Sequence, residues 1–186
     1  MFIINSIFMI NCILNAPSSI DIVSNDDIIS VDVLSVDQSI NQRSNEIKAK
    51  YHHVPMNPDH ICYIVQLCSE YSIDPDIIFA LIEIESKYDP KAKNKYSSAA
   101  GYGQLIASTA KSIAKEIDTI KSYDHKIDAY NPYINILLTI HYFSKCIDKA
   151  GGNINRALRF YRGLNDKHYI NKVLYIKERI KTDKKI

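Results

Sequence analysis

Residues 74–87 read DPDIIFALIEIESK. Asp74 can cap the free amides of a helix and Pro75 fits the first turn, so we predict a helix from Asp76 to about Lys87. The side chains after the cap are apolar on every face of this helix. Because a helix that is apolar all round belongs in the centre of a domain, we expect the rest of the fold to surround it.

Helical patterns continue on both sides of this stretch. Upstream, the apolar side chains from Asp59 to Tyr71 have the spacing of one buried helix face. Downstream, cap signals predict helices over about 108–117, opened by Ser108, and over about 131–149, 153–161 and 168–181. Residues 91–103 are rich in small side chains and are interpreted as a loop. Six helices with little strand signal predict an all-α domain.

The composition changes before residue 51. Met1 to Asn15 resembles the apolar region of a secretion signal, with cleavage after Ala16, and is too short to span a bilayer. Residues 17–50 are rich in Ser, Asp, Asn and Gln, with a weak strand tendency from Asp21 to Val36. We therefore expect a signal peptide over 1–16, a poorly ordered polar linker over 17–50 and a folded catalytic domain over 51–186.

Charge is distributed unevenly along the chain. Residues 1–50 hold six acidic and three basic side chains, whereas residues 51–186 hold 15 acidic and 20 basic ones. A mild basic excess suits an anionic polymer as partner. The basic residues are neither clustered nor interleaved with aromatic residues, so the pattern does not indicate nucleic-acid binding.

The cysteines and histidines do not have the spacing of a metal site. There is no Cys-x-x-Cys pair and no His-Glu-x-x-His motif, so we expect neither a metal nor another cofactor. Two arrangements fit Cys68 and Cys146: a disulfide, if the protein is exported, and two buried free thiols, which we favour.

Two acidic residues, Glu83 and Glu85, stand near the end of the apolar helix. Desolvation disfavours the charged form of a carboxyl group, so such a group can hold a proton and give it to a leaving oxygen. Acids at helix ends are, however, more often salt-bridged than catalytic. Periodicity alone therefore does not make either residue a catalyst.

Motifs around the helix end are more specific. Glu85-Ser86-Lys87-Tyr88-Asp89-Pro90 is followed by Ser98-Ala99-Ala100-Gly101-Tyr102-Gly103-Gln104-Leu105 and by Ser108-Thr109-Ala110. Further along come Asn135-Ile136, the segment Ala157 to Gly163, and Tyr169 with Val173. In this order and spacing, the motifs resemble the soluble lytic transglycosylase (SLT) domain family over about residues 58–180.

The resemblance implies a lysozyme-like helical fold with a cleft for a glycan strand. It also implies non-hydrolytic cleavage of the bond between N-acetylmuramic acid and N-acetylglucosamine in peptidoglycan. Glu85 would protonate the bridging oxygen and then deprotonate the muramic 6-hydroxyl, which closes to a 1,6-anhydro sugar. No second carboxylate is required for this reaction, because the substrate supplies its own nucleophile.

The resemblance also assigns substrate-binding roles to residues around Glu85. Ser86 is expected to orient Glu85 or the substrate, and Gln104 to hydrogen-bond sugar groups from the cleft floor. Gly101, like Gly103, would let the backbone approach the sugar closely, and Tyr161 would point its hydroxyl towards Glu85 or the sugar. We expect a structural partner for Glu83, and we interpret Asp89 as a turn residue.

The chain departs from the family pattern in two places. Arg162 stands where the family usually has Asn, and Tyr102-Gly103 stands where it has Leu-Met. The first change puts one substrate contact in doubt, although an arginine there can meet a peptide-stem carboxylate.

Two other functions fit the same sequence. A lysozyme-type hydrolase would need a second carboxylate, for which Asp89 and Asp124 are the candidates. A catalytically silent glycan-binding or assembly module is the other alternative. The expected location is the periplasm or cell envelope, or a virion if the protein is phage-encoded. Secretion, conjugation or phage assembly systems are the expected partners besides peptidoglycan.

Overall fold

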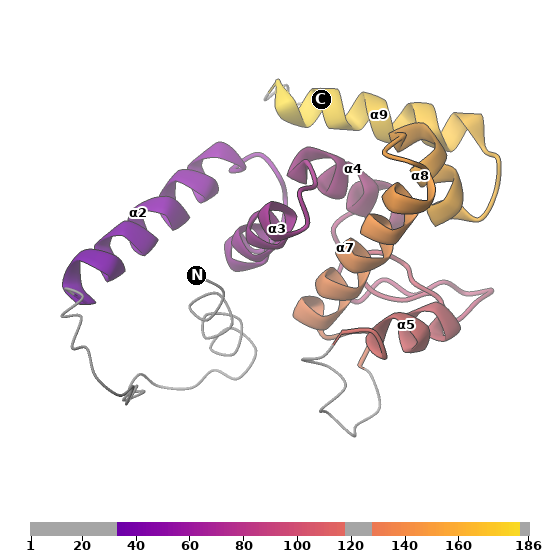
Figure 1. The fold of residues 1–186 in the computed structure, drawn as a ribbon, viewed down its shortest axis with the longest axis horizontal. Helices are drawn as coiled ribbons and strands as arrows, with labels where there is room; N and C mark the ends of the chain where they lie inside the picture. Colours follow the sequence, from indigo (N-terminus) through magenta and orange to yellow (C-terminus); the bar gives the residue numbers. More distant parts are fainter. Residues whose placement is uncertain (1–32, 118–127, 183–186) are drawn as a thin grey trace. The chain divides into compact units, whose positions relative to one another are not determined.

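The computed structural model describes residues 33–117 and 128–182 of the 186-residue chain. Every regular element in these two ranges is an α-helix, which confirms the predicted all-α class. The helices are α2 (Val33–Lys50), α3 (Pro58–Glu70), α4 (Pro75–Ser86), α5 (Ala107–Ala114), α7 (Pro132–Lys149), α8 (Ile154–Arg162) and α9 (Lys167–Lys181) (Figure 1). No helix in the described part of the chain is long and apolar enough to cross a bilayer.

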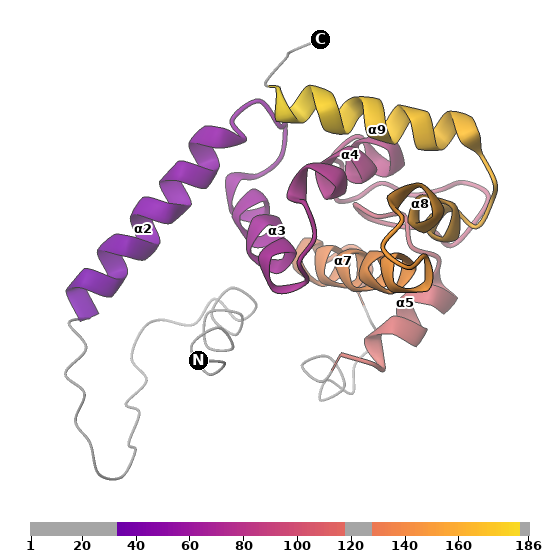
Figure 2. The ribbon, with the colours of Figure 1, turned by 45° about the horizontal axis from the view of Figure 1, so that its top comes forward.

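Helix α4 is the buried centre of the compact unit Gln42–Ile186, as its sequence predicts. Asp74 caps it by accepting a hydrogen bond from the Asp76 amide at 3.0 Å, and Pro75 occupies its first turn. Its side chains from Ile77 to Ile82 are at most 2% exposed. Helix α9 lies along α4, so the last helix of the unit packs against its central helix (Figures 1 and 2).

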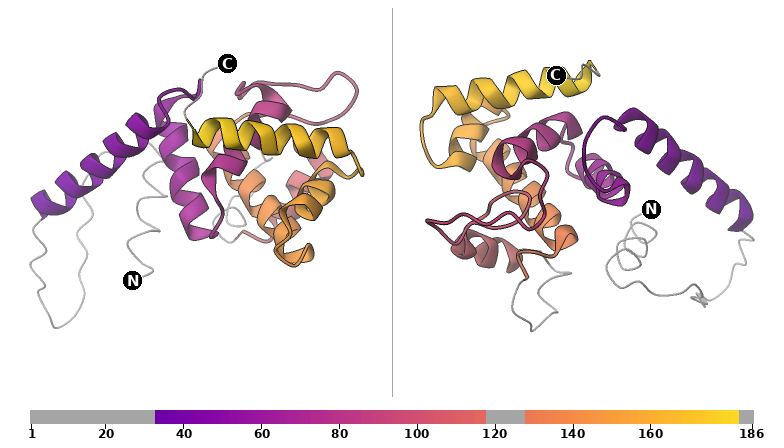
Figure 3. Two further views of the ribbon diagram at one scale, coloured as in Figure 1. Left: turned by 90° about the horizontal axis from the view of Figure 1, so that it is seen from above. Right: turned by 180° about the vertical axis from the view of Figure 1, so that it is seen from behind.

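Helix α7 is the second organising element. Asn131 caps it by accepting hydrogen bonds from the amides of Tyr133 and Ile134. The helix packs against α3, α5 and α8 (Figures 2 and 3). It is therefore buried along much of its length, and its side chains contact the loop that follows α4.

The segment between α4 and α5 is irregular, as predicted. It contains two isolated β-bridges, Lys93 with Ala100 and Ala100 with Leu105. The chain thus doubles back on itself around Ala100. Ala100 is 4% exposed, so this part of the loop belongs to the core and is not a surface excursion.

Two sequence-based expectations about elements are wrong. Ser108 does not cap α5: the cap position is Ile106, without a side-chain bond, and the Ala107 amide instead donates to the Ser98 hydroxyl at 3.0 Å. The serine that accepts a hydrogen bond from the first turn of α5 is thus Ser98, in the preceding loop. This contact depends on the tertiary fold and cannot be predicted from the sequence next to the helix.

The second correction concerns residues 33–50, which are predicted above to be part of a poorly ordered linker. They form helix α2, and residues 33–36 are therefore not in a strand. The stretch contains neither Gly nor Pro, and Gln42 donates to Glu46 four residues later at 3.1 Å. Near its end, Lys48 forms an ion pair with Asp59 at 3.1 Å. The predicted signal peptide and residues 17–32 lie outside the described residues.

Candidate active site

Glu85 lies in the last turn of α4, where the chain changes direction sharply. Lys87 ends the helix in the left-handed conformation with φ 53°, and Tyr88 follows with φ 64°. Positive φ values cost energy for residues other than glycine, and consecutive ones mark a turn that the surrounding structure imposes. The turn leaves the Glu85 side chain half-buried at the point where the buried helix meets the loop.

The Glu85 carboxylate is held by a tyrosine from α9. The Tyr169 hydroxyl donates to Oε1 of Glu85 at 2.6 Å, and the Tyr169 side chain is itself 5% exposed. Desolvation by burial raises the pKa of Glu85, while the Tyr169 hydrogen bond and the positive charge of Arg162 partly oppose that rise. Burial dominates, so the pKa of Glu85 lies above its ordinary value.

Tyr161 is close to Glu85 but bonds elsewhere. Its hydroxyl donates to the Gly103 carbonyl at 2.7 Å. Burial raises the pKa of Tyr161, and the Glu85 charge raises that pKa further, so the two groups interact electrostatically. Of the two expected directions for the Tyr161 hydroxyl, towards Glu85 or towards the sugar, the bond to Glu85 is made by Tyr169 instead. The sugar contact of Tyr161 stays a prediction.

Asn135 holds the loop against α7. Its Nδ2 donates to the carbonyls of Ala100 at 3.0 Å and Ala129 at 2.9 Å, and its Oδ1 accepts from the Gly103 amide at 2.9 Å. The side chain is 2% exposed. Sequence reasoning noted Asn135 only as part of a family motif. An asparagine in the otherwise apolar run from Ile134 to Leu138 is the signal that would have suggested this buried role.

The two glycines of the loop are explained by contact with α7. A Cβ on Gly101 would lie 2.4 Å from Nδ2 of Asn135, and Gly101 has φ +72°. A Cβ on Gly103 would lie 2.0 Å from Oγ1 of Thr139 and 2.8 Å from the Tyr161 hydroxyl. The backbone at Gly101 and Gly103 thus makes a close approach, as expected, and in this structure it approaches helix α7.

Gln104 and Ser86 both bond to backbone groups. Gln104 has φ 48°, and its Nε2 donates to the carbonyls of Ala92 at 3.1 Å and Gly101 at 3.0 Å. Since both partners are acceptors, the amide nitrogen must point inward to the loop. The Ser86 hydroxyl donates to the Ile82 carbonyl at 3.0 Å, within its own helix. Sugar contacts of these two residues stay predictions.

The other acidic residues considered for catalysis have different partners. Glu83 forms an ion pair with Arg179 and accepts a hydrogen bond from the Tyr88 hydroxyl at 2.8 Å, which confirms its expected structural role. Asp89 accepts from the Lys91 amide at 2.8 Å and is confirmed as a turn residue. Asp124 lies outside the described residues.

A cavity of about 530 Å³ opens beside the Glu83 face of α4, between that helix and α9. Its lining includes Ile84, Lys87 and Lys172 but not Glu85. Since Glu83 and Glu85 are two residues apart on a helix, they face different directions. This cavity is therefore separate from the surroundings of the Glu85 carboxylate.

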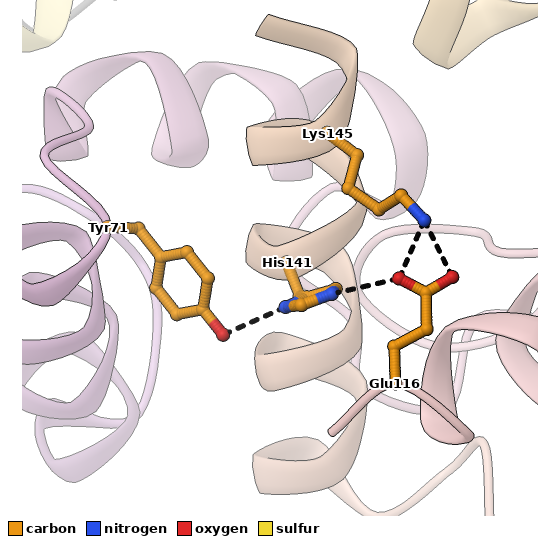
Figure 4. Close-up of polar contacts among 4 residues, drawn as sticks. All are labelled: Tyr71, Glu116, His141 and Lys145. Carbon is orange, nitrogen blue, oxygen red and sulfur yellow. Dashed lines mark hydrogen bonds and ion pairs between the residues drawn. The ribbon is translucent and has the colours of Figure 1, made fainter. Parts of the chain in front are cut away.

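A second polar cluster joins three other elements (Figure 4). The Tyr71 hydroxyl bonds Nδ1 of His141 at 3.0 Å, and Nε2 of His141 lies 3.5 Å from the Glu116 carboxylate. Lys145 donates to both oxygens of that carboxylate at 2.6 Å. The Lys145 hydrogen bond is the main reason that the pKa of Glu116 is lowered. The cluster links the end of α3 and the residues after α5 to α7, which is a structural role.

The described cysteines are free thiols. Cys68 and Cys146 are both buried and neither forms a disulfide, the arrangement favoured from the sequence. Burial raises the pKa of the Cys146 thiol to about 11. At neutral pH this thiol is therefore protonated and a poor nucleophile or metal ligand. Within residues 33–117 and 128–182, no three His, Cys, Asp or Glu side chains come together as metal ligands.

Fold and site together define an all-α domain whose central helix ends in a desolvated carboxyl group beside a loop fastened to a second helix. The family model of the transglycosylase SLT domain matches residues 63–169, which is more than half of the chain. The chain therefore belongs to the transglycosylase SLT domain family, and the resemblance suggested by its motifs is confirmed. The family is one of peptidoglycan lytic transglycosylases, and its lysozyme-like helical fold agrees with the helices described above.

Among solved structures, the chain is similar to an inactive mutant of the lytic transglycosylase Slt from Pseudomonas aeruginosa. The two share 18% sequence identity with a TM-score of 0.49, and the match covers 64% of this chain and 22% of that one. The chain thus spans about a fifth of the length of that enzyme.

Proposed function

We propose that the chain is a lytic transglycosylase that cleaves the bond between N-acetylmuramic acid and N-acetylglucosamine without water, with Glu85 as its catalytic acid and base. The observation that carries the proposal is the environment of Glu85: a half-buried carboxyl group with raised pKa that accepts a hydrogen bond from Tyr169. Burial favours the protonated acid, and the phenol gives the carboxylate a partner after the proton has left.

The reaction uses the same carboxyl group twice, first as an acid and then as a base. Glu85 gives its proton to the bridging oxygen, the glycosidic bond breaks, and positive charge develops at the anomeric carbon of the muramic sugar. The carboxylate then takes the proton of the muramic 6-hydroxyl as that oxygen bonds to the anomeric carbon. Glu85 ends protonated, ready for another cycle, and the product carries a 1,6-anhydro ring.

The remaining site residues are proposed to shape the cleft. Gly101 and Gln104 lie in the loop after α4, and Tyr161 lies on α8 and bonds that loop. Hydrogen bonds hold this region in place, so its substrate contacts would be made by a rigid surface. Ser86 would support the helix end that carries Glu85. We also propose that the protein is exported and acts in the periplasm or cell envelope, with residues 1–16 as its signal.

A pair of matched variants tests the assignment of Glu85. Glu85→Gln keeps the size of the side chain and removes the transferable proton, so we expect the release of soluble fragments from purified peptidoglycan to fall by roughly 100- to 10,000-fold. Because burial raises the folded-state pKa of Glu85, the charged form destabilises the fold as pH rises through that pKa. Glu85→Gln should therefore unfold at the wild-type temperature or above it at neutral pH.

Glu83→Gln is the control, and it should lower stability while leaving activity largely intact. It leaves the half-buried Arg179 without its ionic partner, at a cost of about 1–3 kcal/mol in the free energy of unfolding. Activity measured well below the melting temperature should stay within a few fold of wild type. Equal behaviour of the two variants, or more than a tenth of wild-type activity in a folded Glu85→Gln, would show that Glu85 is not the acid.

A further inference from the structure

Arg162 is the last residue of α8 and stands beside the proposed acid. Its side chain is exposed, and its guanidinium carbon lies 5.2 Å from the centre of the Tyr169 ring. That ring carries the hydroxyl that bonds Glu85. The Tyr169 side chain therefore contacts the guanidinium of Arg162 through its ring and the carboxyl group of Glu85 through its hydroxyl.

The backbone fixes this arrangement. Gly163 ends α8 in the left-handed conformation with φ 73°, and Asp166 starts α9 by accepting a hydrogen bond from the Tyr169 amide at 3.0 Å. The short turn between them brings Arg162 and Tyr169 face to face, although they belong to different helices. A guanidinium stacked on an aromatic ring keeps its edge, with the N–H donors, open to a ligand.

The donors of Arg162 are not used by the described part of the protein. No described carboxylate forms a salt bridge with it, and its hydrogen-bond donors have no acceptor there, whereas Arg179 pairs with Glu83 and Arg156 donates to the Ala150 carbonyl. Asp166, the nearest acid in sequence, bonds the Tyr169 amide. Arg162 is thus a preorganised cation beside the proposed acid, and no carboxylate within residues 33–117 and 128–182 forms a salt bridge with it.

We propose that Arg162 is a specificity-determining residue that binds a carboxylate of the substrate glycan next to the bond cleaved. A planar guanidinium accepts a carboxylate through two parallel hydrogen bonds, a geometry that an asparagine cannot offer. The inference rests on the proposed function and deepens it, because it makes the preferred substrate a carboxylated glycan and not a neutral one.

The charge of Arg162 gives a second argument for this ligand. The positive charge lowers the pKa of Glu85, which works against holding a proton, and it would repel the positive charge that develops on the sugar. A substrate carboxylate on the guanidinium cancels both effects. Binding of the right substrate would thus help Glu85 to keep its proton.

Two sources of carboxylate exist in peptidoglycan: the peptide stem and, where the stem has been removed, the lactyl group of the muramic sugar. Both present the same chemistry to Arg162. Glycan strands with intact stems and strands stripped of stems by an amidase therefore form two arms of the test, and a neutral chitooligosaccharide forms the third.

The test compares Arg162→Asn, which installs the usual family residue, with Arg159→Asn, an exposed arginine one turn earlier on α8. In the full chain, Arg162→Asn should raise KM for carboxylated strands roughly 10- to 100-fold, the range of one charge-assisted contact, and preserve or raise kcat. Arg162→Lys should recover part of the lost affinity. Arg159→Asn should leave KM and kcat unchanged. The arm in which the KM effect persists identifies the stem or the lactyl group as the source.

Binding measured by calorimetry in the Glu85→Gln background separates this inference from the proposed function. There, Arg162→Asn should weaken binding of carboxylated strands and leave binding of the chitooligosaccharide unchanged. Equal weakening for both ligands, an unchanged KM, or a kcat abolished by Arg162→Asn would overturn the inference. Arg162-dependent binding of strands that the wild-type chain does not cleave would instead refute the proposed function alone.

Discussion

At the scale of single residues, the hydrogen bond from Tyr169 to Glu85 matters because it acts on both protonation states of one group. Burial favours the protonated carboxyl group, and the phenol favours the carboxylate. A group that gives a proton and takes one back in the same turnover works best when neither state is strongly preferred. The opposed effects on Glu85 fit that requirement.

Tyr169→Phe tests this balance. The change removes the hydrogen bond but keeps the ring on which Arg162 stacks, so the pKa of Glu85 should rise. Glu85 then holds its proton to higher pH, and the high-pH limb of the kcat profile should move to higher pH. Because the carboxyl group also loses its anchor, we expect a lower maximal rate, by roughly tenfold.

Tyr175→Phe is the matched control for this change. Tyr175 lies on the same helix and is 65% exposed, so its pH profile should coincide with that of wild type. A high-pH limb that moves to lower pH in Tyr169→Phe would contradict the described role of the phenol.

The residue-scale predictions from sequence succeeded where chemistry is local. Glu83 was expected to have a structural partner, and it has Arg179 and Tyr88. The sequence could not predict which of Tyr161 and Tyr169 bonds Glu85, because this depends on how α9 lies along α4. Both tyrosines stand in recognisable motifs, and only tertiary packing decides which hydroxyl reaches Glu85.

At the scale of elements, helix starts with strong local caps were predicted well. Asp74, Asn131 and Asn153 each cap the helix expected of them. Ser108 was a wrong choice because the serine that bonds the first turn of α5 comes from a loop nine residues away. Helix α2 was not predicted because its residues are mostly polar. A stretch without Gly or Pro can nevertheless form a helix from polar residues when side-chain pairs stabilise it.

The contact between the loop and α7 leads to a prediction about Gly103. Gly103→Ala would place a Cβ 2.0 Å from Oγ1 of Thr139, a β-branched residue with little rotational freedom in a helix. We expect a loss of about 1–3 kcal/mol in the free energy of unfolding, or more, measured by denaturant titration.

Gly152→Ala is the control in which glycine is replaced without a steric clash. Its Cβ would have no neighbour within 4 Å, but its φ of +80° is unfavourable for alanine, so we expect a cost of about 1 kcal/mol. Similar costs for both variants would show that the fit of the loop against α7 is not what requires glycine at position 103.

At the scale of the whole molecule, the compact unit combines the proposed acid with a moderate excess of positive charge. Residues 51–186 hold 20 basic and 15 acidic side chains, which suits an anionic polymer such as carboxylated glycan. The family match ends at residue 169, so it includes Glu85, Arg162 and Tyr169 but not the rest of α9. Helix α9 is nevertheless the support on which Tyr169 is held against α4.

The two candidate enzymes on this fold differ in the atom that attacks the sugar. A hydrolase needs a second carboxylate. Of the two candidates, Asp89 is engaged in a turn, and Asp124 lies outside the described residues. A transglycosylase needs only the muramic 6-hydroxyl, for which effective molarities of about 10⁵ M or more are known in well-oriented intramolecular reactions. This hydroxyl should therefore react before water does.

Digestion of purified peptidoglycan in heavy-oxygen water, with mass analysis of the soluble fragments, shows whether the muramic 6-hydroxyl or water attacks the sugar. If the 6-hydroxyl attacks, the fragments should end in 1,6-anhydro-N-acetylmuramic acid, be lighter than hydrolysis products by one water, carry no solvent oxygen and resist borohydride. Fragments with mainly labelled, reducing ends would contradict the transglycosylase assignment, and would leave Glu85 as the acid of a hydrolase.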